Sequence, residues 1–321
     1  MTEIRIANHL TEAEVDAVLE IVRLAAEEDG VAPLSEHVML HLRYGGDRLA
    51  RNFMLLAAAD QAGGQTASSI VGYAHLDPTD PVEGPSGELV IHPARRRRGF
   101  GLALVHALEA EAGDRQLRLW AHGDLPAATR LAAAAGFQRV RALWQMRRSL
   151  QARLGRPQLA QGIAVRTFEV GRDEQPWTKL NARAFARHPE QGAWTLADLD
   201  LREREPWFDP AGFFLAERDG KLVGFHWTKI HGRDGEAHAG GDHEHQALGE
   251  VYVVGVDPDE RGTGLGRALT LVGLQYLRSR GLFQVMLYVD ESNTPAIGLY
   301  ESLGFTHWDT DVMFARWADD R

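Results

Sequence analysis

The chain has 321 residues, a formal net charge of −10, 44% hydrophobic and 25% charged residues, and no cysteine. Its composition is that of a globular protein, and its length suits two domains of ordinary size. The acidic balance argues against a general nucleic-acid surface, and the lack of cysteine excludes disulfides, cysteine–metal sites and a cysteine nucleophile.

The first residues, Met1-Thr-Glu-Ile-Arg-Ile, lack the apolar core of a signal peptide, and no stretch is long and apolar enough to span a membrane. We therefore expect a cytoplasmic protein, working as a monomer, with neither nucleic acid nor membrane as a partner.

Strands and helices are predicted in mixed order along the first half. A capping box, Thr11-x-x-Glu14, opens the first helix, and Gly45-Gly46 ends the second, Ser35–Tyr44. Two more helices follow, one ending near Ala112 and one at Leu125–Ala135. The predicted strands are Ile4–Ile6, Asn52–Ala59, Ser68–His75, Glu88–Ile91, Leu117–Ala121 and Leu143–Arg148, the last closing the half.

The second half repeats this order after a linker at Gln151–Gly162. Helices are expected at Asp173–Ala186, Leu265–Arg280 and Asn293–Leu303, and an acidic, tryptophan-rich segment runs from Trp194 to Trp207. Strands are expected at Ile163–Phe168, Phe213–Arg218, Leu222–Thr228, Val251–Val256, Gln284–Val289 and near Val312.

A glycine-rich turn joins the strand Val251–Val256 to the helix that follows. Its pattern is Arg261-x-x-Gly264-x-Gly266, which matches neither the nucleoside-triphosphate loop nor Gly-x-Gly-x-x-Gly. Backbone N–H groups at such a helix start favour a phosphate, and glycine lets the anion approach closely. Alone, the turn is equally a plain entry into a helix.

The same pattern occurs earlier in the chain, at Arg96-x-x-Gly99-x-Gly101, an offset of 165 residues (261 − 96). Gly136-Phe137 and Gly304-Phe305 match at an offset of 168 (304 − 136). Ordered matches of this kind indicate two copies of one domain, an α/β fold (α+β with a mixed sheet), here 1–150 and 160–321.

These residues resemble the GCN5-related N-acetyltransferase (GNAT) family. The resemblance rests on the strand, x-Pro, the Arg-x-x-Gly-x-Gly loop and helix, and then Asn293-x-x-Ala296-x-x-Leu-Tyr300-x-x-x-Gly304-Phe305. It implies two tandem GNAT domains and acetyl-CoA as the co-substrate, up to one per domain, with no metal.

Further short strings resemble tandem members of this family that acetylate the cysteinyl amine of a cysteinyl-glucosaminyl-inositol, a small thiol-amine. These strings are Ser35-Glu-His, His188-Pro-Glu-Gln-Gly192, Phe225-His-Trp-Thr-Lys229 and Gly249-Glu-Val-Tyr-Val-Val-Gly-Val-Asp-Pro258. An acidic chain also suits another cationic acceptor, such as an aminoglycoside or polyamine, and a non-catalytic CoA-binding sensor is a further alternative.

The resemblance assigns acetyl-CoA contacts to the strand before each loop, to each loop with its helix start, and to the turn at Asn293. In the second half these are Val254, Gly255, Val256, Arg261, Gly262, Thr263, Gly264, Leu265, Gly266, Arg267, Asn293, Thr294, Pro295, Ala296, Ile297 and Gly298. In the first half they are Leu89, Val90, Ile91, Arg97, Arg98, Gly99, Phe100, Gly101 and Leu102.

Two residues are candidates for proton transfer. An amine acceptor must lose a proton before it attacks, and Glu250 at the head of the strand is the candidate general base; otherwise it is an exposed carboxylate. Tyr300 is the candidate acid for the leaving thiolate; otherwise it is an aromatic core residue.

Acceptor contacts follow from the resemblance alone. Besides Glu250, they are Glu36 at a helix start, Glu190 in a loop between helices, Lys229 at the end of a hairpin, and Tyr288 on the strand after the loop.

The two halves are not equivalent. At the offset of 168, Ala132 stands for Tyr300 and Leu125 for Asn293; at 165, Pro85 stands for Glu250. We therefore expect the first half to bind acetyl-CoA or CoA without turnover. The histidine-rich segment His231–His245 is interpreted as a solvated loop and not as a metal site.

Overall fold

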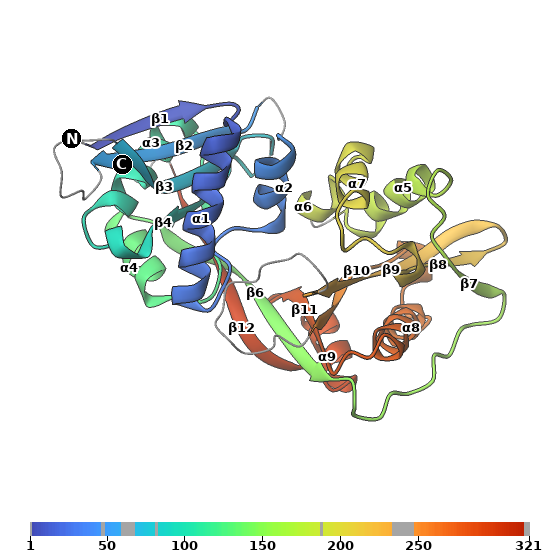
Figure 1. Cartoon of the computed structure of the whole chain (residues 1–321). Coiled ribbons are helices and arrows are strands. Elements are labelled where there is room, and N and C mark those ends of the chain that lie inside the picture. Colours follow the sequence, from blue (N-terminus) through green and yellow to red (C-terminus); the bar gives the residue numbers. More distant parts are fainter. Residues whose placement is uncertain are drawn as a thin grey trace. The chain divides into compact units, whose positions relative to one another are not determined.

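The computed structural model of the chain describes residues 2–45, 49–58, 68–80, 83–186, 189–232 and 247–317. These form two compact units (Figure 1). The described residues of unit 1 fall within Met1–Leu143 and Asp309–Arg321, and those of unit 2 within Trp144–Ala237 and Glu244–Trp308. The mixed α/β class expected from the sequence is confirmed.

Unit 1 is built on the strand order β1-β2-β3-β4-β5-β12. Its strands are β1 (Thr2–Ala7), β2 (Arg51–Ala58), β3 (Ser68–Asp77), β4 (Ser86–Ile91), β5 (Leu117–Ala121) and β12 (Thr306–Arg316). Antiparallel pairs join β1 to β2, β2 to β3, β3 to β4 and β12 to β5, whereas β4 and β5 are parallel.

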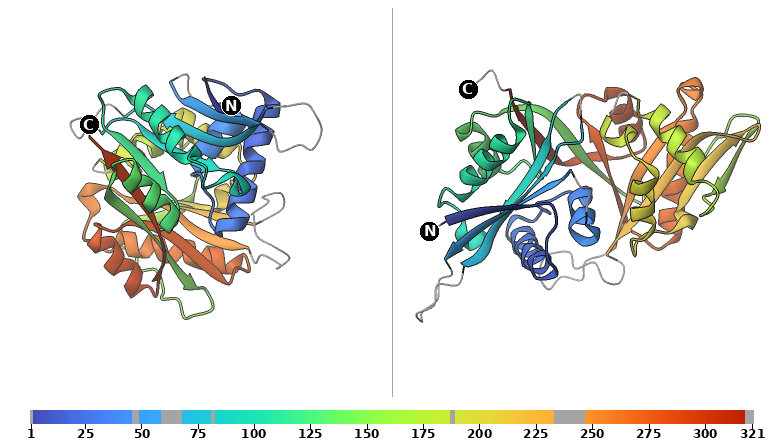
Figure 2. Two further views of the ribbon diagram at one scale, coloured as in Figure 1. Left: turned by 90° about the vertical axis from the view of Figure 1, so that its left-hand side faces the viewer. Right: turned by 90° about the horizontal axis from the view of Figure 1, so that it is seen from above.

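Helices cover both faces of the unit 1 sheet, and Figure 2 shows the two pairs on opposite sides. Helices α1 (Glu12–Asp29) and α2 (Glu36–Tyr44) pack on the face that carries Tyr73 and Val90. Helices α3 (Phe100–Ala112) and α4 (Pro126–Ala134) pack on the opposite face, where Phe53 and Leu119 are buried. Each helix places an apolar stripe on the sheet, as its sequence pattern predicts.

Unit 2 has the strand order β6-β11-β10-β9-β8-β7. Its strands are β6 (Gln138–Ser149), β7 (Ile163–Thr167), β8 (Phe213–Arg218), β9 (Lys221–His231), β10 (Leu248–Val256) and β11 (Gln284–Asp290). One face is covered by α5 (Glu174–Ala184) and α7 (Leu196–Glu203), with α6 (Pro189–Gly192) between them in the chain. The other is covered by α8 (Leu265–Ser279) and α9 (Thr294–Ser302).

The last strand of each half differs from the expectation. From Trp144 onward β6 belongs to unit 2, where β11 is its neighbour, and from Asp309 onward β12 belongs to unit 1, where it pairs with β5. The strand Leu143–Arg148 therefore does not close the first half. An apolar strand pattern states that a strand exists but not which sheet edge receives it.

The linker expected at Gln151–Gly162 carries no regular structure from Gln151 to Ala160. It lies along α8, since the amide of Gln275 donates a hydrogen bond to the carbonyl of Gly155 over 3.1 Å. None of the described helices is long and apolar enough to cross a bilayer.

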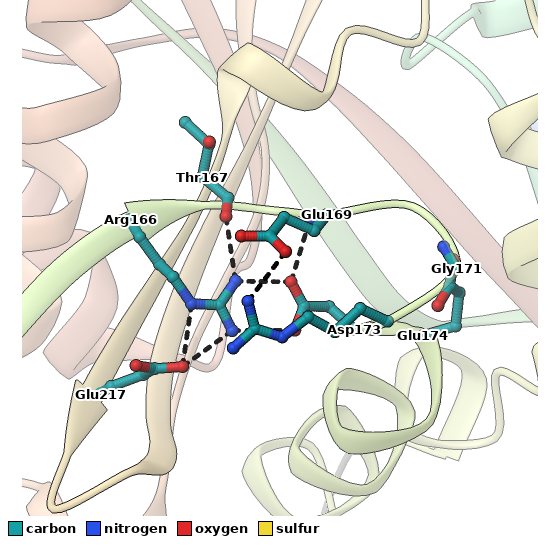
Figure 3. Close-up of polar contacts among 8 residues, drawn as sticks. Arg166, Thr167, Glu169, Gly171, Asp173, Glu174 and Glu217 are labelled. Carbon is teal, nitrogen blue, oxygen red and sulfur yellow. Dashed lines mark hydrogen bonds and ion pairs between the residues drawn. The ribbon is translucent and has the colours of Figure 1, made fainter.

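A buried charge pair anchors the edge strand β7 of unit 2 (Figure 3). The guanidinium of Arg166 donates to both carboxylate oxygens of Asp173, over 2.5 and 2.8 Å, and its Nε donates to Glu217 on β8 over 2.9 Å. Asp173 is the residue before α5 and also accepts the backbone N–H of Glu169. One arginine thus joins β7, β8 and the start of α5.

This pair gives a stability prediction. Asp173→Ala removes two hydrogen bonds of Arg166 and the acceptor of the Glu169 N–H at a site where the carboxylate side chain is 2% exposed, so the free energy of unfolding should fall by about 2 kcal/mol. Arg172→Ala is the control, because Arg172 is 58% exposed, pairs with the exposed Glu169 and has only a 4.0 Å contact with Asp173; the free energy of unfolding should change far less than in Asp173→Ala. Equal losses in urea unfolding would contradict the anchoring role.

Candidate functional site

In unit 2, the parallel strands β10 and β11 separate after a short ladder. Their pairing runs from Gly249 with Val285 to Val251 with Leu287, and the later residues of these two fully described strands do not continue it. β10 stays paired with β9 on its other side as far as Val256. The edge of β10 at Val254–Val256 therefore lies open to a ligand that offers its own backbone-like hydrogen bonds.

Glu250 lies where this separation begins. It pairs with Met286 of β11 in the last part of the ladder and with Lys229 of β9 on the other side. Its side chain is 9% exposed, and Oε2 lies 2.7 Å from Nε2 of His231. The exposed carboxylate considered as the alternative for Glu250 is therefore wrong, because the residue is buried and hydrogen-bonded.

The same ladder corrects the position of Lys229 and of one histidine. Because β9 continues to His231, Lys229 is inside the strand and does not end the hairpin. His231 is the first residue of the segment interpreted as a solvated loop, yet it is in a strand and contacts Glu250. The contact between His231 and Glu250 can be predicted only once the β9–β10 register is known. Residues 233–246, with His238, His243 and His245, lie outside the described residues.

Aromatic side chains line the sheet around Lys229. Its ammonium lies 4.4 Å from the ring centroid of Trp207 and 5.7 Å from that of Tyr252. The guanidinium of Arg202 lies 3.7 Å from the ring of Trp194 and donates to the hydroxyl of Tyr252 over 2.8 Å. The segment Trp194–Trp207 thus holds two buried cations against aromatic faces.

Tyr300 lies on α9, partly buried against Phe305 with ring centroids 5.8 Å apart. Burial raises the pKa of Tyr300 to about 12, so the phenol carries its proton at neutral pH. The packing agrees with a core aromatic residue, and the protonated hydroxyl agrees with a proton donor, so the contacts leave both roles open.

The glycine-rich loop has the geometry of an anion cradle. Gly262 and Gly264 have φ values of +79° and +84°, which glycine adopts without strain, and a Cβ added at either would meet no atom within 4 Å. In α8, Ala268 is the first residue whose N–H reaches back to Gly264, and no side chain caps the helix. The N–H groups of Leu265, Gly266 and Arg267 are those that a helix start leaves for a ligand.

Unit 1 has the same loop. Gly99 has φ +80° and open space around it, α3 starts without a side-chain cap, and Ala103 donates back to Gly99. Arg97, with φ +64°, stands where unit 2 has Gly262. Both loops could therefore hold a phosphate.

The arginine of each motif has a structural contact. Arg96 donates to both oxygens of Asp29, at the end of α1, over 2.6 and 2.7 Å. Arg261 donates to the carbonyl of Ala184, at the end of α5, over 3.0 Å. These contacts fix the loops to the neighbouring helices.

The remaining residues predicted to contact acetyl-CoA or the acceptor are placed as follows in the two units. Oδ1 of Asn293 accepts the N–H of Ala296 over 3.3 Å and so caps α9. The hydroxyl of Tyr288, on β11 beyond its pairing with β10, accepts from the amide of Gln145 over 2.9 Å. Glu36 is the first residue of α2, after its cap Ser35. Glu190 is in the single-turn helix α6, not in a loop.

Three comparisons bear on this arrangement, beginning with a family profile. The acetyltransferase (GNAT) family matches residues 19–137 and 177–305, which together make up more than half of the chain.

The chain belongs to the GNAT acetyltransferase family.

The tandem GNAT resemblance is thereby confirmed, and the chain is an acetyl-CoA-dependent N-acetyltransferase. It is 58% identical to a protein named mycothiol acetyltransferase from Thermobispora bispora, over 98% of this chain and 99% of the relative. A relative of the same name from Acidothermus cellulolyticus is 58% identical over 98% of this chain and 95% of its own length. The tandem members that the sequence resembles are these mycothiol synthases.

A solved structure agrees in fold. A tandem GNAT protein from the clavulanic acid biosynthesis pathway aligns with a TM-score of 0.69 at 22% identity, over 99% of both chains. Among the described residues, no three histidine, aspartate or glutamate side chains are grouped to hold a metal.

Strand pairing matches one residue of the two repeats differently than a fixed sequence offset does. Glu250 pairs with Met286, and the matching ladder of unit 1 pairs Ser86 with Arg118, the residue equivalent to Met286 at the offset of 168. The counterpart of Glu250 is therefore Ser86 and not Pro85. The cause is an irregularity between Val251 and Val253 in the β9–β10 ladder, which places one extra residue in β10.

In unit 1 a buried charge cluster lies where β4 and β5 separate, and no local sequence pattern predicts it. Nδ1 of His122 lies 3.0 Å from Asp311 of β12, and its Nε2 lies 3.3 Å from Glu88 of β4. Glu88 also accepts the N–H of Ser35, and Asp311 that of Gly123.

The surroundings favour the charged forms of His122 and Glu88. Burial opposes the charge on His122, but the Glu88 carboxylate and the hydrogen bond that Nδ1–H of His122 donates to Asp311 outweigh it and raise the pKa of His122 to about 10. Burial likewise opposes the charge on Glu88, yet the charge and hydrogen bond of His122 hold the pKa of Glu88 below its usual value. The cluster ties β4, the residue after β5, and β12 together.

This cluster predicts a pH dependence of stability. An unfolded histidine titrates near pH 6.5, so the charge of His122 stabilises the fold fully below about pH 6.5, and that contribution is lost as the pH rises through about 10. Asp311→Asn should cost about 3 kcal/mol at pH 6. It should also reduce the fall in Tm between pH 6 and pH 10.

Asp124→Asn is the matched control, because Asp124 is exposed and near His122 in sequence. It should leave both the Tm and its pH dependence unchanged. The same fall in Tm between pH 6 and pH 10 in Asp311→Asn and in the unaltered chain would contradict the assignment.

Proposed function

We propose that the chain transfers an acetyl group from acetyl-CoA to the cysteinyl amine of cysteinyl-glucosaminyl-inositol, giving mycothiol and CoA. The observation that carries the proposal is the 58% identity to a protein named mycothiol acetyltransferase, over 98% of this chain and 99% of that relative. The chain would do this as a monomer in the cytoplasm, on a small molecule, with neither nucleic acid nor membrane as a partner.

The loop and β10 supply the binding groups for acetyl-CoA, which brings the acetyl thioester. Within the predicted range from Arg261 to Arg267, the N–H groups of the first turn of α8, with the dipole of this helix, would hold the pyrophosphate. The open edge at Val254–Val256 would pair with the pantetheine arm, and one of its N–H groups would donate to the thioester oxygen as negative charge develops there. Such a donor contributes about 3 kcal/mol in acyl transfer. The turn from Asn293 to Gly298 would contact the same ligand.

Glu250 is the proposed general base. It would take a proton from the acceptor ammonium, directly or through water, so that the neutral amine forms the new N–C bond as the C–S bond breaks. Tyr300 would give its proton to the departing thiolate, and the second amine proton would leave to solvent. Burial of Glu250 at the strand separation and the protonated phenol of Tyr300 support these roles.

Unit 1 is proposed to bind acetyl-CoA or CoA through Leu89–Ile91 and Arg97–Leu102 without turnover. Its loop matches that of unit 2, but Ser86 and Ala132 stand where unit 2 has Glu250 and Tyr300. Glu36, Glu190, Lys229 and Tyr288 remain predicted contacts of the acceptor, carried by the resemblance.

Thiol release from acetyl-CoA with a panel of amines tests the function. We expect cysteinyl-glucosaminyl-inositol to be preferred over an aminoglycoside and over spermidine by at least about 100-fold in kcat/KM, because buried polar groups discriminate against acceptors that leave them unpaired. Turnover confined to the aminoglycoside or to spermidine would show that the proposed acceptor is wrong. No release with any amine would favour a CoA-binding sensor.

A matched pair of glycine variants tests the division of roles. Gly264→Glu and Gly99→Glu add the same charge at nearly the same φ, each into open space, so their backbone strain is alike. Gly264→Glu should raise KM for acetyl-CoA by about tenfold or more, because the added carboxylate repels the phosphates. Gly99→Glu should leave kcat nearly unchanged; an equal loss of kcat in both would contradict turnover by unit 2 alone.

A further inference from the structure

We propose that His231 is the positioning residue of Glu250: its Nε2–H holds one carboxylate oxygen, so that the other oxygen is the one that takes the proton of the acceptor amine. The inference rests on the proposed function and adds to it a residue to which neither the family match nor the sequence analysis gave a role.

The contact is built into the sheet. His231 is the last residue of β9 and pairs with Leu248, two residues before Glu250 on β10, so the two side chains are diagonal neighbours on one face. Nε2 lies 2.7 Å from Oε2, and the side chains are 15% and 9% exposed. Because the ladder already fixes both backbones, only the two side chains must be ordered to keep this contact.

The direction of the hydrogen bond follows from the chemistry. An ionised carboxylate can only accept, so Nε2 of His231 carries the hydrogen and donates it. This bond fixes the rotation of the carboxyl group of Glu250 and so the direction in which its other oxygen points. Oε1 is then left for the amine proton. This is the arrangement in which a third group orients a catalytic base.

Lys229, the second neighbour of Glu250 in the β9–β10 ladder, lies against aromatic rings. Lys229 is directly opposite Glu250 in the ladder, but its ammonium lies 4.4 Å from the ring centroid of Trp207 and 5.7 Å from that of Tyr252. Aromatic faces therefore contribute to the position of this cation. The short contact between His231 and Glu250 is a separate restraint on the carboxylate.

His226, on the same strand, shows what a purely structural histidine is like here. It is fully buried, Nδ1 lies 2.8 Å from the carbonyl of Leu269, and the ring packs against Gly273 of α8. His231 differs because its ring is partly exposed and its partner is a carboxylate.

A double-mutant cycle tests the proposal with the full-length chain, acetyl-CoA and the best acceptor of the amine panel. His231→Phe should lower kcat by about 10- to 100-fold and leave KM for acetyl-CoA unchanged. His231→Gln keeps an amide donor near the position of Nε2 and should restore most of the rate. In the Glu250→Gln background, His231→Phe should cause no further loss, because its effect passes through Glu250.

An NMR measurement without acetyl-CoA gives a second readout. The chain has 14 histidines, so the ring signals of His231 are assigned as those missing from His231→Gln. ¹⁵N shifts should report a hydrogen on Nε2 in the unaltered chain and a changed ring environment in Glu250→Gln.

Three results would overturn the role of His231: full kcat in His231→Phe, the same fold loss in both backgrounds, or ring signals indifferent to Glu250→Gln. The proposed function fails in a different way. It fails if the unaltered chain releases no thiol with any amine, an outcome in which the ring signals of His231 still report the contact with Glu250.

Discussion

Parallel pairing between β10 and β11 ends at Val251 and Leu287, and the backbone hydrogen bonds on that edge of β10 end with it. The constraint is general, because backbone polar groups must find partners in protein, water or ligand. Val254–Val256 therefore present a strand edge just before a helix start that also leaves N–H groups unpaired. One extended ligand with a phosphate end would satisfy both, and Glu250 lies where the strands separate.

Unit 1 has the same early separation of its two parallel strands, but a buried charge cluster lies beside it. In unit 1, β4 and β5 pair only at Ser86–Arg118 and Gly87–Leu119, so these strands also separate early. Glu88 follows at once, and its carboxylate is taken up by His122 and the N–H of Ser35. These contacts stabilise the fold and occupy the carboxylate of Glu88, which agrees with the proposal that unit 1 binds CoA without turnover.

Cations in unit 2 are placed by packing as much as by ion pairs. Lys229 and Arg202 lie against Trp207 and Trp194, and both are buried. Aromatic faces hold a cation without cancelling a nearby carboxylate. Lys229 and Glu250 are directly opposite each other in one ladder, and the carboxylate has its short contact with His231.

Local residue patterns were enough to predict most helices and strands, the repeat and both glycine loops. This follows because caps, apolar periodicity and left-handed glycines act over a few residues, as at Thr11-x-x-Glu14 and Gly264. The resemblance in turn pointed to the family, which the profile match confirms.

Only the tertiary structure decided to which unit β6 and β12 belong. It also showed that the counterpart of Glu250 in unit 1 is Ser86 and not Pro85, and that His231 contacts the Glu250 carboxylate. Each depends on strand register or on an irregularity in a ladder. Strand register is set by contacts between distant segments, which no local pattern records.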